Sequence, residues 1–546
     1  MQYIQTITIG LFALSIAAAH PAALQAINNT GENSLRIIHT NDIHAHYSPF
    51  NRVGRDCSEH DVKSGNCFGG AARLVTTVNQ LRNGHPNSLL FDAGDQAQGT
   101  LFYTIGKFNT TIKVMNQLKY DAMCIGNHEF DDGPDLLAEF FSKIHFPAIC
   151  ANIDMTKNPR LKSVVKPYIV FEKYKLGVIG YITNTTGNIS QAGPTVSFSN
   201  AAVAVNRYVK ELRAKGIKRI IAVSHNGYHE DIDVATNTRG LDLIVGGHSH
   251  TYLSLNASEP GAGGLYPTAV KNLDGQTTYV VQAKAWGEYV GYVDLVFNSD
   301  GSVASISGEP IHMTQSISED AIMAANVSEW RRPFEAYGKT VVGNITTETG
   351  IENCPQMECA MGDLTTDAML WSLNRIQQTD MALLTSGTIR AGLSAGPVTS
   401  KDLLLIYPFG DDIVRITISG KRLRSIITGG FKMVNLFNGR PVIKFIQISG
   451  VRVKYHMDPS NSIRYSKIID SIEISKNGVL EVLDDTRTYS LATIWHIARG
   501  MDNVIDPPID GVPLQRLEKA VKEYLQTFSP VTPATDGRMF EMLTEV

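Results

Sequence analysis

Short apolar runs, each followed by polar residues, recur through the first half of the chain. Five of these runs have the length expected of β-strands, and they cover residues 35–40, 87–91, 122–125, 219–224 and 241–245. Segments with helical periodicity lie between them, for example 201–215, which precedes Gly216. Such alternation predicts an α/β fold in which nearly continuous apolar strands are covered on both faces.

The polar cluster after each strand contains side chains that bind metals or move protons. In open α/β sheets a ligand site forms beyond the carboxyl ends of the strands, so we expect these side chains to meet in one crevice. Two pairs, Asp42 with His44 and His248 with His250, have i, i+2 spacing, which in an extended segment directs both side chains the same way. The glycine in Asp92-Ala93-Gly94-Asp95 lets the backbone turn and present Asp95.

The number of candidate metal ligands indicates more than one ion. Seven are too many for a single tetrahedral site: Asp42, His44, Asp95, Asn127, His225, His248 and His250. Two ions that share a bridging carboxylate, for which Asp95 is the natural choice, would use all of them. Such a pair generates a hydroxide near neutral pH and clamps the attacking and leaving oxygens at phosphorus. Nitrogen and oxygen ligands without thiolate suit zinc, manganese, iron or cobalt.

The second half of the chain reads as a further domain. Residues 316–337 have the pattern of a helical connector, and we expect the domain boundary near Lys339. The second domain is predicted to mix helices and strands and to close with 513–528, where a stripe of core residues repeats at helical spacing: Leu514, Leu517, Val521, Leu525 and Phe528.

Length and composition agree with this division. A chain of 546 residues is too long for one ordinary core. With 43% hydrophobic and 19% charged residues and a net charge of -4, it has the composition of a soluble globular protein. The absence of a basic excess argues against nucleic acid as a partner and against an electrostatic membrane anchor.

Several features predict a secreted, extracellular protein. Residues 4–19 are apolar and end in small residues, so 1–19 resembles a signal peptide, although the usual preceding positive charge is missing. Cys57 and Cys67 are close enough for a local disulfide, as are Cys354 and Cys359. Cys124 and Cys150 either pair or are buried thiols. Neither a transmembrane segment nor a hydrophobic tail typical of a GPI signal is evident. Seven sequons for N-glycosylation begin at Asn28, Asn109, Asn184, Asn188, Asn256, Asn326 and Asn344.

The N-terminal motifs resemble the metallophosphoesterase signature in order and kind. They are Asp42-Ile43-His44, Gly94-Asp95, Gly126-Asn127-His128-Glu129, His225 and Gly247-His248-Ser249-His250. Their fuller forms, such as Thr40-Asn41-Asp42-Ile43-His44, are similar to the 5′-nucleotidase family, which includes ecto-5′-nucleotidases, apyrases and UDP-sugar hydrolases. The resemblance implies a four-layer α/β/β/α sandwich with two metals over 30–315. It also implies a helical linker over 316–338 and a mixed α+β nucleotide-binding domain over 339–546.

The resemblance also implies a role for each candidate residue. One ion would be held by Asp42, His44, Asp95 and His250, and the other by Asp95, Asn127, His225 and His248. Zinc is the first choice of metal. His128 and Asp131 would form a catalytic dyad at the phosphoryl group, because an imidazolium oriented by a carboxylate can stabilise charge or protonate a leaving oxygen. Glu129 is left with no role other than a structural one.

In the second domain, Arg390 would bind the substrate phosphate and Phe409 would stack on the base. His496, with Trp495 beside it, takes the position of a second stacking aromatic, and Asp502 keeps the position that binds ribose hydroxyls. The chain departs from the family in two places. Thr385-Ser386-Gly387-Thr388-Ile389-Arg390 replaces Asn-Gly-Gly-Gly-Ile-Arg, and the Cys354–Cys359 loop lacks an arginine.

These patterns predict a secreted, metal-dependent 5′-nucleotidase that releases phosphate from nucleoside 5′-phosphates by attack of an activated hydroxide. An apyrase-like hydrolase of nucleoside di- or triphosphates, or a UDP-sugar hydrolase, is the alternative with the same metal centre. A catalytically weakened nucleotide-binding protein is an alternative of another class, which the complete metal set disfavours. The expected partner is a small nucleotide, and the sequence does not predict an oligomeric state.

Overall fold

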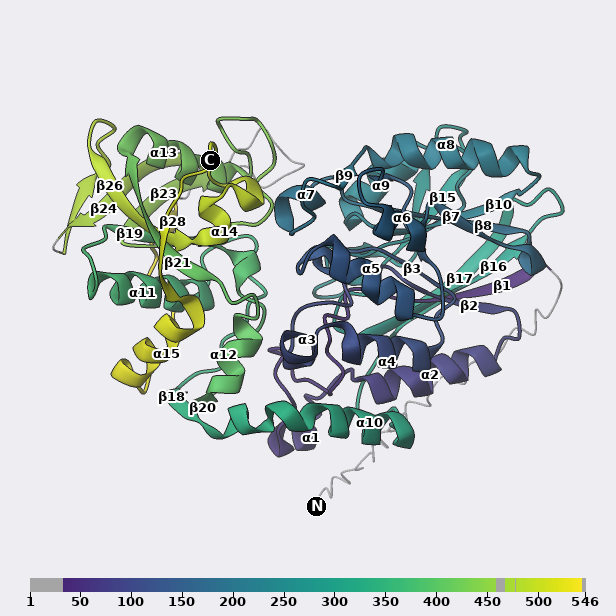
Figure 1. Ribbon diagram of the computed structural model, residues 1–546, viewed down its shortest axis with the longest axis horizontal. Helices are drawn as coiled ribbons and strands as arrows, with labels where there is room; N and C mark the ends of the chain where they lie inside the picture. Colours follow the sequence, from purple (N-terminus) through teal and green to yellow (C-terminus); the bar gives the residue numbers. More distant parts are fainter. Residues whose placement is uncertain (1–32, 458–466, 477, 543–546) are drawn as a thin grey trace, which may run out of the picture.

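A computed structural model describes residues 33–457, 467–476 and 478–542, so the segment expected to be a signal peptide and the sequon at Asn28 lie outside it. The chain forms two domains that lie side by side, with helix α10 (Ala321–Arg331) along their lower edge (Figure 1). Buried apolar residues from Leu35 to Phe334 form two clusters, and those from Val342 to Met539 form a third.

The first sheet of the N-terminal domain has seven strands and a mostly parallel centre. In spatial order they are β17 (Val303–His312), β16 (Tyr289–Phe297), β1 (Ser34–Thr40), β2 (Ser88–Asp92), β3 (Ala122–Cys124), β4 (Ala148–Ile149) and β6 (Val165–Lys166). From β1 to β6 neighbouring strands are parallel, whereas β16 and β17 are antiparallel additions. The strands predicted at 35–40, 87–91 and 122–125 are confirmed.

The second sheet of this domain has six strands with a parallel centre. Their order is β14 (Thr268–Lys271), β15 (Thr277–Val281), β11 (Leu243–Val245), β10 (Arg219–His225), β8 (Leu176–Ile182) and β7 (Tyr168–Phe171). Ile37 and Phe91 of the first sheet share one apolar cluster with Val178 and Val223 of the second, so the two sheets pack face to face.

Helices cover the outer face of each sheet, which completes four layers. On the first sheet they are α2 (Ala71–Asn83), α4 (Phe108–Leu118) and α5 (Pro134–Lys143), and on the second α8 (Ala201–Ala214) and α9 (Tyr228–Thr236) (Figure 1). The Asn200 side chain caps the start of α8, which confirms the helix predicted at 201–215. The remaining helices of this domain are α1 (Glu59–Ser64), α3 (Leu101–Gly106), α6 (Pro159–Val164) and α7 (Thr186–Ile189).

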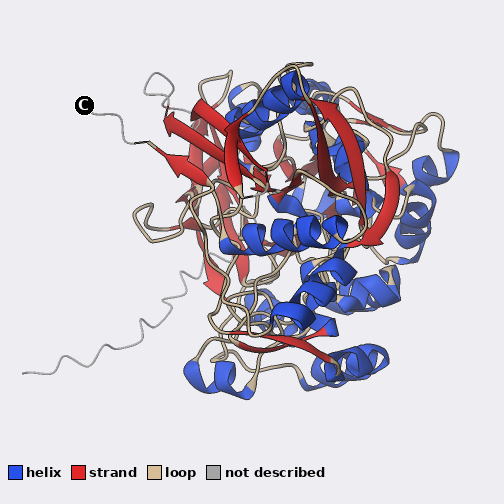
Figure 2. Ribbon diagram, turned by 90° about the vertical axis from the view of Figure 1, so that its left-hand side faces the viewer, coloured by secondary structure: helices blue, strands red, loops and turns tan. Residues whose placement is uncertain are grey.

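The C-terminal domain is mixed α+β, as predicted, and Figure 2 views the molecule from its side. One sheet contains β22 (Ile446–Ser449), β19 (Met381–Thr385), β26 (Thr488–Ile494), β21 (Asp412–Ser419) and β27 (Val512–Arg516). Another contains β25 (Val479–Val482), β24 (Lys467–Lys476), β23 (Val451–Met457) and β28 (Met539–Glu541), and β18 (Val341–Ile345) pairs with β20 (Gly396–Thr399). Its helices are α11 (Ala360–Asn374), α12 (Ser400–Ile406), α13 (Gly420–Lys432), α14 (Trp495–Ala498) and α15 (Leu517–Phe528).

The helical prediction over 513–528 was wrong at its start. Helix α15 begins at Leu517, and the residues before it form strand β27, where the backbone of Gln515 pairs with Ile413 of β21. Edge pairing of this kind accommodates Pro513, which cannot donate a ladder hydrogen bond. Leu517, Val521 and Leu525 are buried as expected, whereas Phe528 is 47% exposed.

Both predicted local disulfides are present, Cys57–Cys67 and Cys354–Cys359. Cys124 and Cys150 are buried thiols, which decides between the two alternatives left by the sequence. Within the described residues, no helix combines the length and the apolar character that crossing a bilayer requires.

Candidate active site

The candidate ligands gather because the parallel strands end at one edge of each sheet. Thr40 of β1 is level with Asp92 of β2, and Asp92 is level with Met123 of β3. The loops that follow these three strands therefore begin side by side. The same holds in the second sheet, where β10 and β11 run parallel: β10 ends at His225, and β11 ends just before His248 and His250.

The loops that carry the ligands are strained rather than extended. Six residues at or next to the ligand positions have left-handed backbone conformations, with φ between 48° and 76°: Asp42, His44, Ala45, Asp95, His248 and His250. The extended geometry predicted from the i, i+2 spacing is therefore wrong. Each such residue costs about 1–3 kcal/mol, and such strain concentrates at functional sites, where the surrounding structure maintains it.

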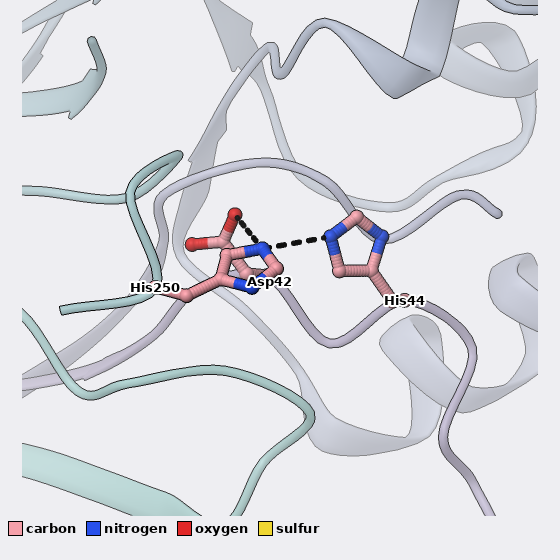
Figure 3. Close-up of side chains that lie close together, drawn as sticks. All are labelled: Asp42, His44 and His250. Carbon is pink, nitrogen blue, oxygen red and sulfur yellow. Dashed lines mark hydrogen bonds and ion pairs between the residues drawn. The ribbon is translucent and has the colours of Figure 1, made fainter. Parts of the chain in front are cut away.

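One group of potential metal ligands consists of Asp42, His44 and His250, whose ligand atoms lie within 4.8 Å of one another. His250 Nε2 is 3.3 Å from Asp42 Oδ1 and 3.1 Å from His44 Nε2. Figure 3 shows the His250 ring between the other two side chains, which all project from loops. Two imidazole nitrogens and a carboxylate that converge in this way form a donor set for a divalent transition-metal ion.

A second group of potential ligands consists of Asp95, His225 and His248. Asp95 Oδ2 lies 3.1 Å from His225 Nε2 and 3.7 Å from His44 Nε2, so this carboxylate lies between the two groups. Asn127 joins the second group, because its Oδ1 is 3.1 Å from His225 Nε2. All seven candidate ligands are thus brought together, with Asp95 in the middle.

The backbone orients two of the imidazoles for metal binding. His44 Nδ1 is 3.0 Å from the carbonyl oxygen of Ala97, and His225 Nδ1 is 2.7 Å from that of Ala93. A proton on each Nδ1 satisfies the carbonyl and leaves Nε2 with its lone pair directed at the site, an arrangement typical of metal-ligating histidines. The residues present therefore fit divalent metal ions.

Charge and burial determine which of these imidazoles are neutral. Burial lowers the pKa of His44, His248 and His250, so these rings are unprotonated and able to ligate. Burial also lowers the pKa of His225, but the Asp95 carboxylate outweighs it and raises the pKa to about 10. A cation that binds beside Asp95 must therefore displace this proton.

His128 is oriented by a carboxylate instead. Its Nδ1 lies 2.6 Å from Asp131 Oδ2, and the backbone amide of His128 donates to Asp95 Oδ1 at 2.9 Å. His128 and Asp131 belong to one turn, which starts at Asn127 and includes a short 3-10 helix, His128–Phe130. Burial lowers the pKa of His128, but Asp131 and Asp95 outweigh it and the net pKa is raised, which favours an imidazolium.

A single cavity of about 170 Å³ extends from the ligand groups to the C-terminal domain. Arg390 enters it, and its Nη2 donates to His44 Nε2 at 3.1 Å. The Phe409 ring stacks on the His128 ring with centroids 5.8 Å apart, and the Arg390 guanidinium lies 5.7 Å from the Phe409 centroid. His496 and Asp502 also line the cavity, so all four residues expected to bind substrate meet there.

Sequence reasoning missed two charged residues that line the cavity, Lys444 and Asp411. Glu129, which was expected to have only a structural role, is fully buried. Asp411 follows the Phe409-Gly410 motif, a position from which its role could have been suspected. Lys444 is an isolated lysine before strand β22, and no local pattern marks it. Burial raises the pKa of Asp411 to about 6.

A four-layer sandwich with these ligand groups defines the class of calcineurin-like phosphoesterases, and the model of that family matches residues 35–252. The chain is thus a metal-dependent hydrolase of phosphoric monoesters. A second model, the 5′-nucleotidase C-terminal domain, matches residues 341–506.

Curated relatives cover almost the whole chain. A human 5′-nucleotidase is 33% identical over 93% of this chain and 91% of its own length. A snake venom 5′-nucleotidase of Gloydius brevicauda is 31% identical over 93% and 89%. The crystal structure of a 5′-nucleotidase precursor from Thermus thermophilus has a TM-score of 0.84 and 32% identity, covering 94% of this chain and 100% of its own. The chain belongs to the 5′-nucleotidase family.

Proposed function

We propose that the protein removes the 5′-phosphate from nucleoside monophosphates. The observation that carries this proposal is the cavity shared by the two domains. It has the ligand groups and the His128–Asp131 pair on one side, and Arg390 and Phe409 on the other. A nucleotide in this cavity can thus place its phosphate near Asp95 while its base stacks on Phe409. The 5′-nucleotidase activity in the names of the relatives supports the same assignment.

The proposed cofactors are two divalent ions, zinc first, with manganese, cobalt or iron as alternatives. Asp42, His44, Asp95 and His250 would hold one ion, and Asp95, Asn127, His225 and His248 would hold the other. When bound, such ions supply Lewis acidity toward water and neutralise charge on phosphoryl oxygens. The buried, mostly neutral imidazoles described above support this donor set.

The chain's own residues supply the remaining chemistry. As an imidazolium, which its raised pKa favours, His128 binds Asp131 through Nδ1–H and carries a second proton on Nε2, so it is the proposed donor to the ester oxygen that leaves. Arg390 is the proposed phosphate-binding fork. His496 is proposed to flank the base opposite Phe409. Asp502 accepts from the Thr385 hydroxyl through Oδ2 at 2.6 Å, and its Oδ1 is proposed to bind the ribose.

Product analysis on purified, metal-loaded protein tests the function. The substrates are a nucleoside mono-, di- and triphosphate and UDP-glucose, assayed with zinc, manganese or cobalt. We expect release of inorganic phosphate from the monophosphate and loss of activity on complete chelation. Preferred cleavage of diphosphates or UDP-glucose would instead identify an apyrase or a UDP-sugar hydrolase. Binding without turnover of any substrate would identify a nucleotide-binding protein.

The variant His128→Ala tests the proposed role of His128 as a proton donor. It removes the proposed proton donor but none of the proposed metal ligands. We therefore expect kcat to fall at least about a hundredfold, as for loss of a general acid, while the metal content measured by mass spectrometry stays that of the wild type. Unchanged turnover would exclude the dyad.

We also propose that the protein is secreted and extracellular. Two disulfides, at Cys57–Cys67 and Cys354–Cys359, are typical of proteins that pass through an oxidising compartment. The sequon asparagines Asn109, Asn184, Asn256 and Asn344 are exposed, and the snake venom origin of three relatives points the same way. Expression in a eukaryotic cell should yield glycosylated protein in the medium. Retention of unglycosylated protein in the cytosol would contradict this proposal.

A further inference from the structure

An arginine and a lysine face the substrate cavity. Among the described residues that line the cavity there is one arginine, Arg390, and one lysine, Lys444. Arg390 is close to the first ligand group through His44, whereas Lys444 lies before strand β22 and reaches the cavity from another direction. An ester phosphate carries up to two negative charges, so a second cation is chemically useful there.

Among the described residues, the Lys444 side chain forms neither an ion pair nor a hydrogen bond, although it is half-buried. Burial lowers the pKa of Lys444, and the charge of Arg390 lowers it further, while the carboxylates of Asp502, Asp42 and Asp95 oppose this. Two cations that repel each other across a cavity are an anion-binding arrangement.

The turn just before Arg390 supports the side chain of Lys444. A Cβ built on Gly387 would lie 3.0 Å from Lys444 Cγ, so the aliphatic part of the lysine packs directly on the backbone of this turn. Gly387 begins the segment that leads to Arg390, within the 3-10 turn Ser386–Thr388. The lysine stem is therefore supported along one side, and its ammonium is left to the cavity.

We propose that Lys444 is a second phosphate-binding residue, which acts with Arg390 to hold the phosphate of the substrate in the cavity. This inference rests on the proposed function, because it takes the bound phosphate to be that of a nucleotide. Lys444 supplies a mobile point charge, while Arg390 supplies a planar fork, so the two cations contact a phosphoryl group from different sides.

Substitution of Lys444 tests this role in the full-length, zinc-loaded protein. Lys444→Ala removes the charge, Lys444→Arg keeps it, and Lys421→Ala removes an exposed lysine at the start of α13 in the same domain. A hydrogen bond to a charged group is worth a factor of about ten to a hundred. We expect Lys444→Ala to lower kcat/KM for the nucleoside monophosphate by that factor. Lys444→Arg should keep most of the wild-type kcat/KM, and Lys421→Ala should leave kcat/KM unchanged.

Binding of inorganic phosphate, measured by calorimetry, separates this inference from the proposed function. Lys444→Ala should weaken phosphate binding about as much as it lowers kcat/KM, with an unchanged thermal unfolding midpoint. Phosphate affinity equal to that of the wild type overturns the role of Lys444, whatever the substrate is. If the wild-type protein hydrolyses no nucleotide but the substitution still weakens phosphate binding, the proposed function fails and the phosphate site remains.

Discussion

Glu129 connects two of the strand-end loops through its carboxylate. Its Oε2 accepts from the amides of Asp95 and Gly126 at 2.9 and 2.7 Å, and its Oε1 accepts from those of Gln96 and Ala97 at 2.8 and 3.0 Å. Four backbone donors thus end on one buried side chain. Because Asp95 is left-handed, with φ of 57°, this contact holds the central ligand in a conformation that it would otherwise leave.

The variant Glu129→Gln should therefore weaken metal binding. An amide offers one oxygen, so two of the four donors lose their acceptor whichever way the amide is turned. We expect metal affinity to fall about ten- to a hundredfold, as for other partners that orient ligands. Titration with zinc measures this. Glu139→Gln, which changes a side chain of α5 that is 45% exposed, is the matched control, and equal zinc affinity in both variants would contradict the role of Glu129.

At the scale of elements, the strands bring the ligand-bearing segments together, and the loops orient the ligand side chains. Parallel pairing of β1, β2 and β3 brings three chain segments to one edge, and β10 and β11 do the same in the second sheet. Glycines at the contacts between these loops then allow the loop backbones to approach one another. A Cβ on Gly126 would lie 2.3 Å from the amide nitrogen of Asp95, and one on Gly247 would lie 2.8 Å from the carbonyl oxygen of Ala93. These glycines are required by the packing of the loops.

At the scale of the whole molecule, the site is completed by the second domain. Phe409 stacks on His128 and lies under Arg390, so an aromatic ring from one domain covers the dyad of the other. In the proposed function, the first domain supplies the metal ligands and the dyad, whereas the second supplies the base-stacking ring Phe409 and the phosphate-binding cations Arg390 and Lys444. Changes in the base-binding part of the C-terminal domain should alter binding of the nucleoside while leaving binding of the phosphate intact.

The variant Phe409→Ala tests this separation. Loss of a stacking ring costs about 1–3 kcal/mol per base, so KM for the nucleoside monophosphate should rise about tenfold. The affinity for inorganic phosphate should not change, in contrast to Lys444→Ala. Phe437→Ala, which removes a 47% exposed ring of the same domain, is the control. A parallel loss of phosphate affinity in Phe409→Ala would show that the ring supports the phosphate site instead.

Most of the first domain follows from local pattern, because nearly continuous apolar runs define its parallel strands and polar residues mark their ends. The start of α15 does not, because Leu514 fits a helical stripe equally well and only pairing of β27 with β21 makes it a strand. The extended geometry predicted for Asp42 and His44 failed for a similar reason. Left-handed conformations at these residues are held by distant contacts, such as the hydrogen bond from the His44 amide to the Asp95 carbonyl.

The sequence by itself determined the fold class, the two-domain composition and the set of candidate ligands, because strand periodicity and motif order are local properties. It also identified Arg390 as a candidate for phosphate binding and Phe409 as a candidate for base stacking. Only the tertiary structure decided that Glu129 supports the Asp95 loop and that Lys444 faces the cavity. Neither role could be read locally, because the contacts come from segments far away in the chain: residues 95–97 for Glu129 and the turn at Gly387 for Lys444.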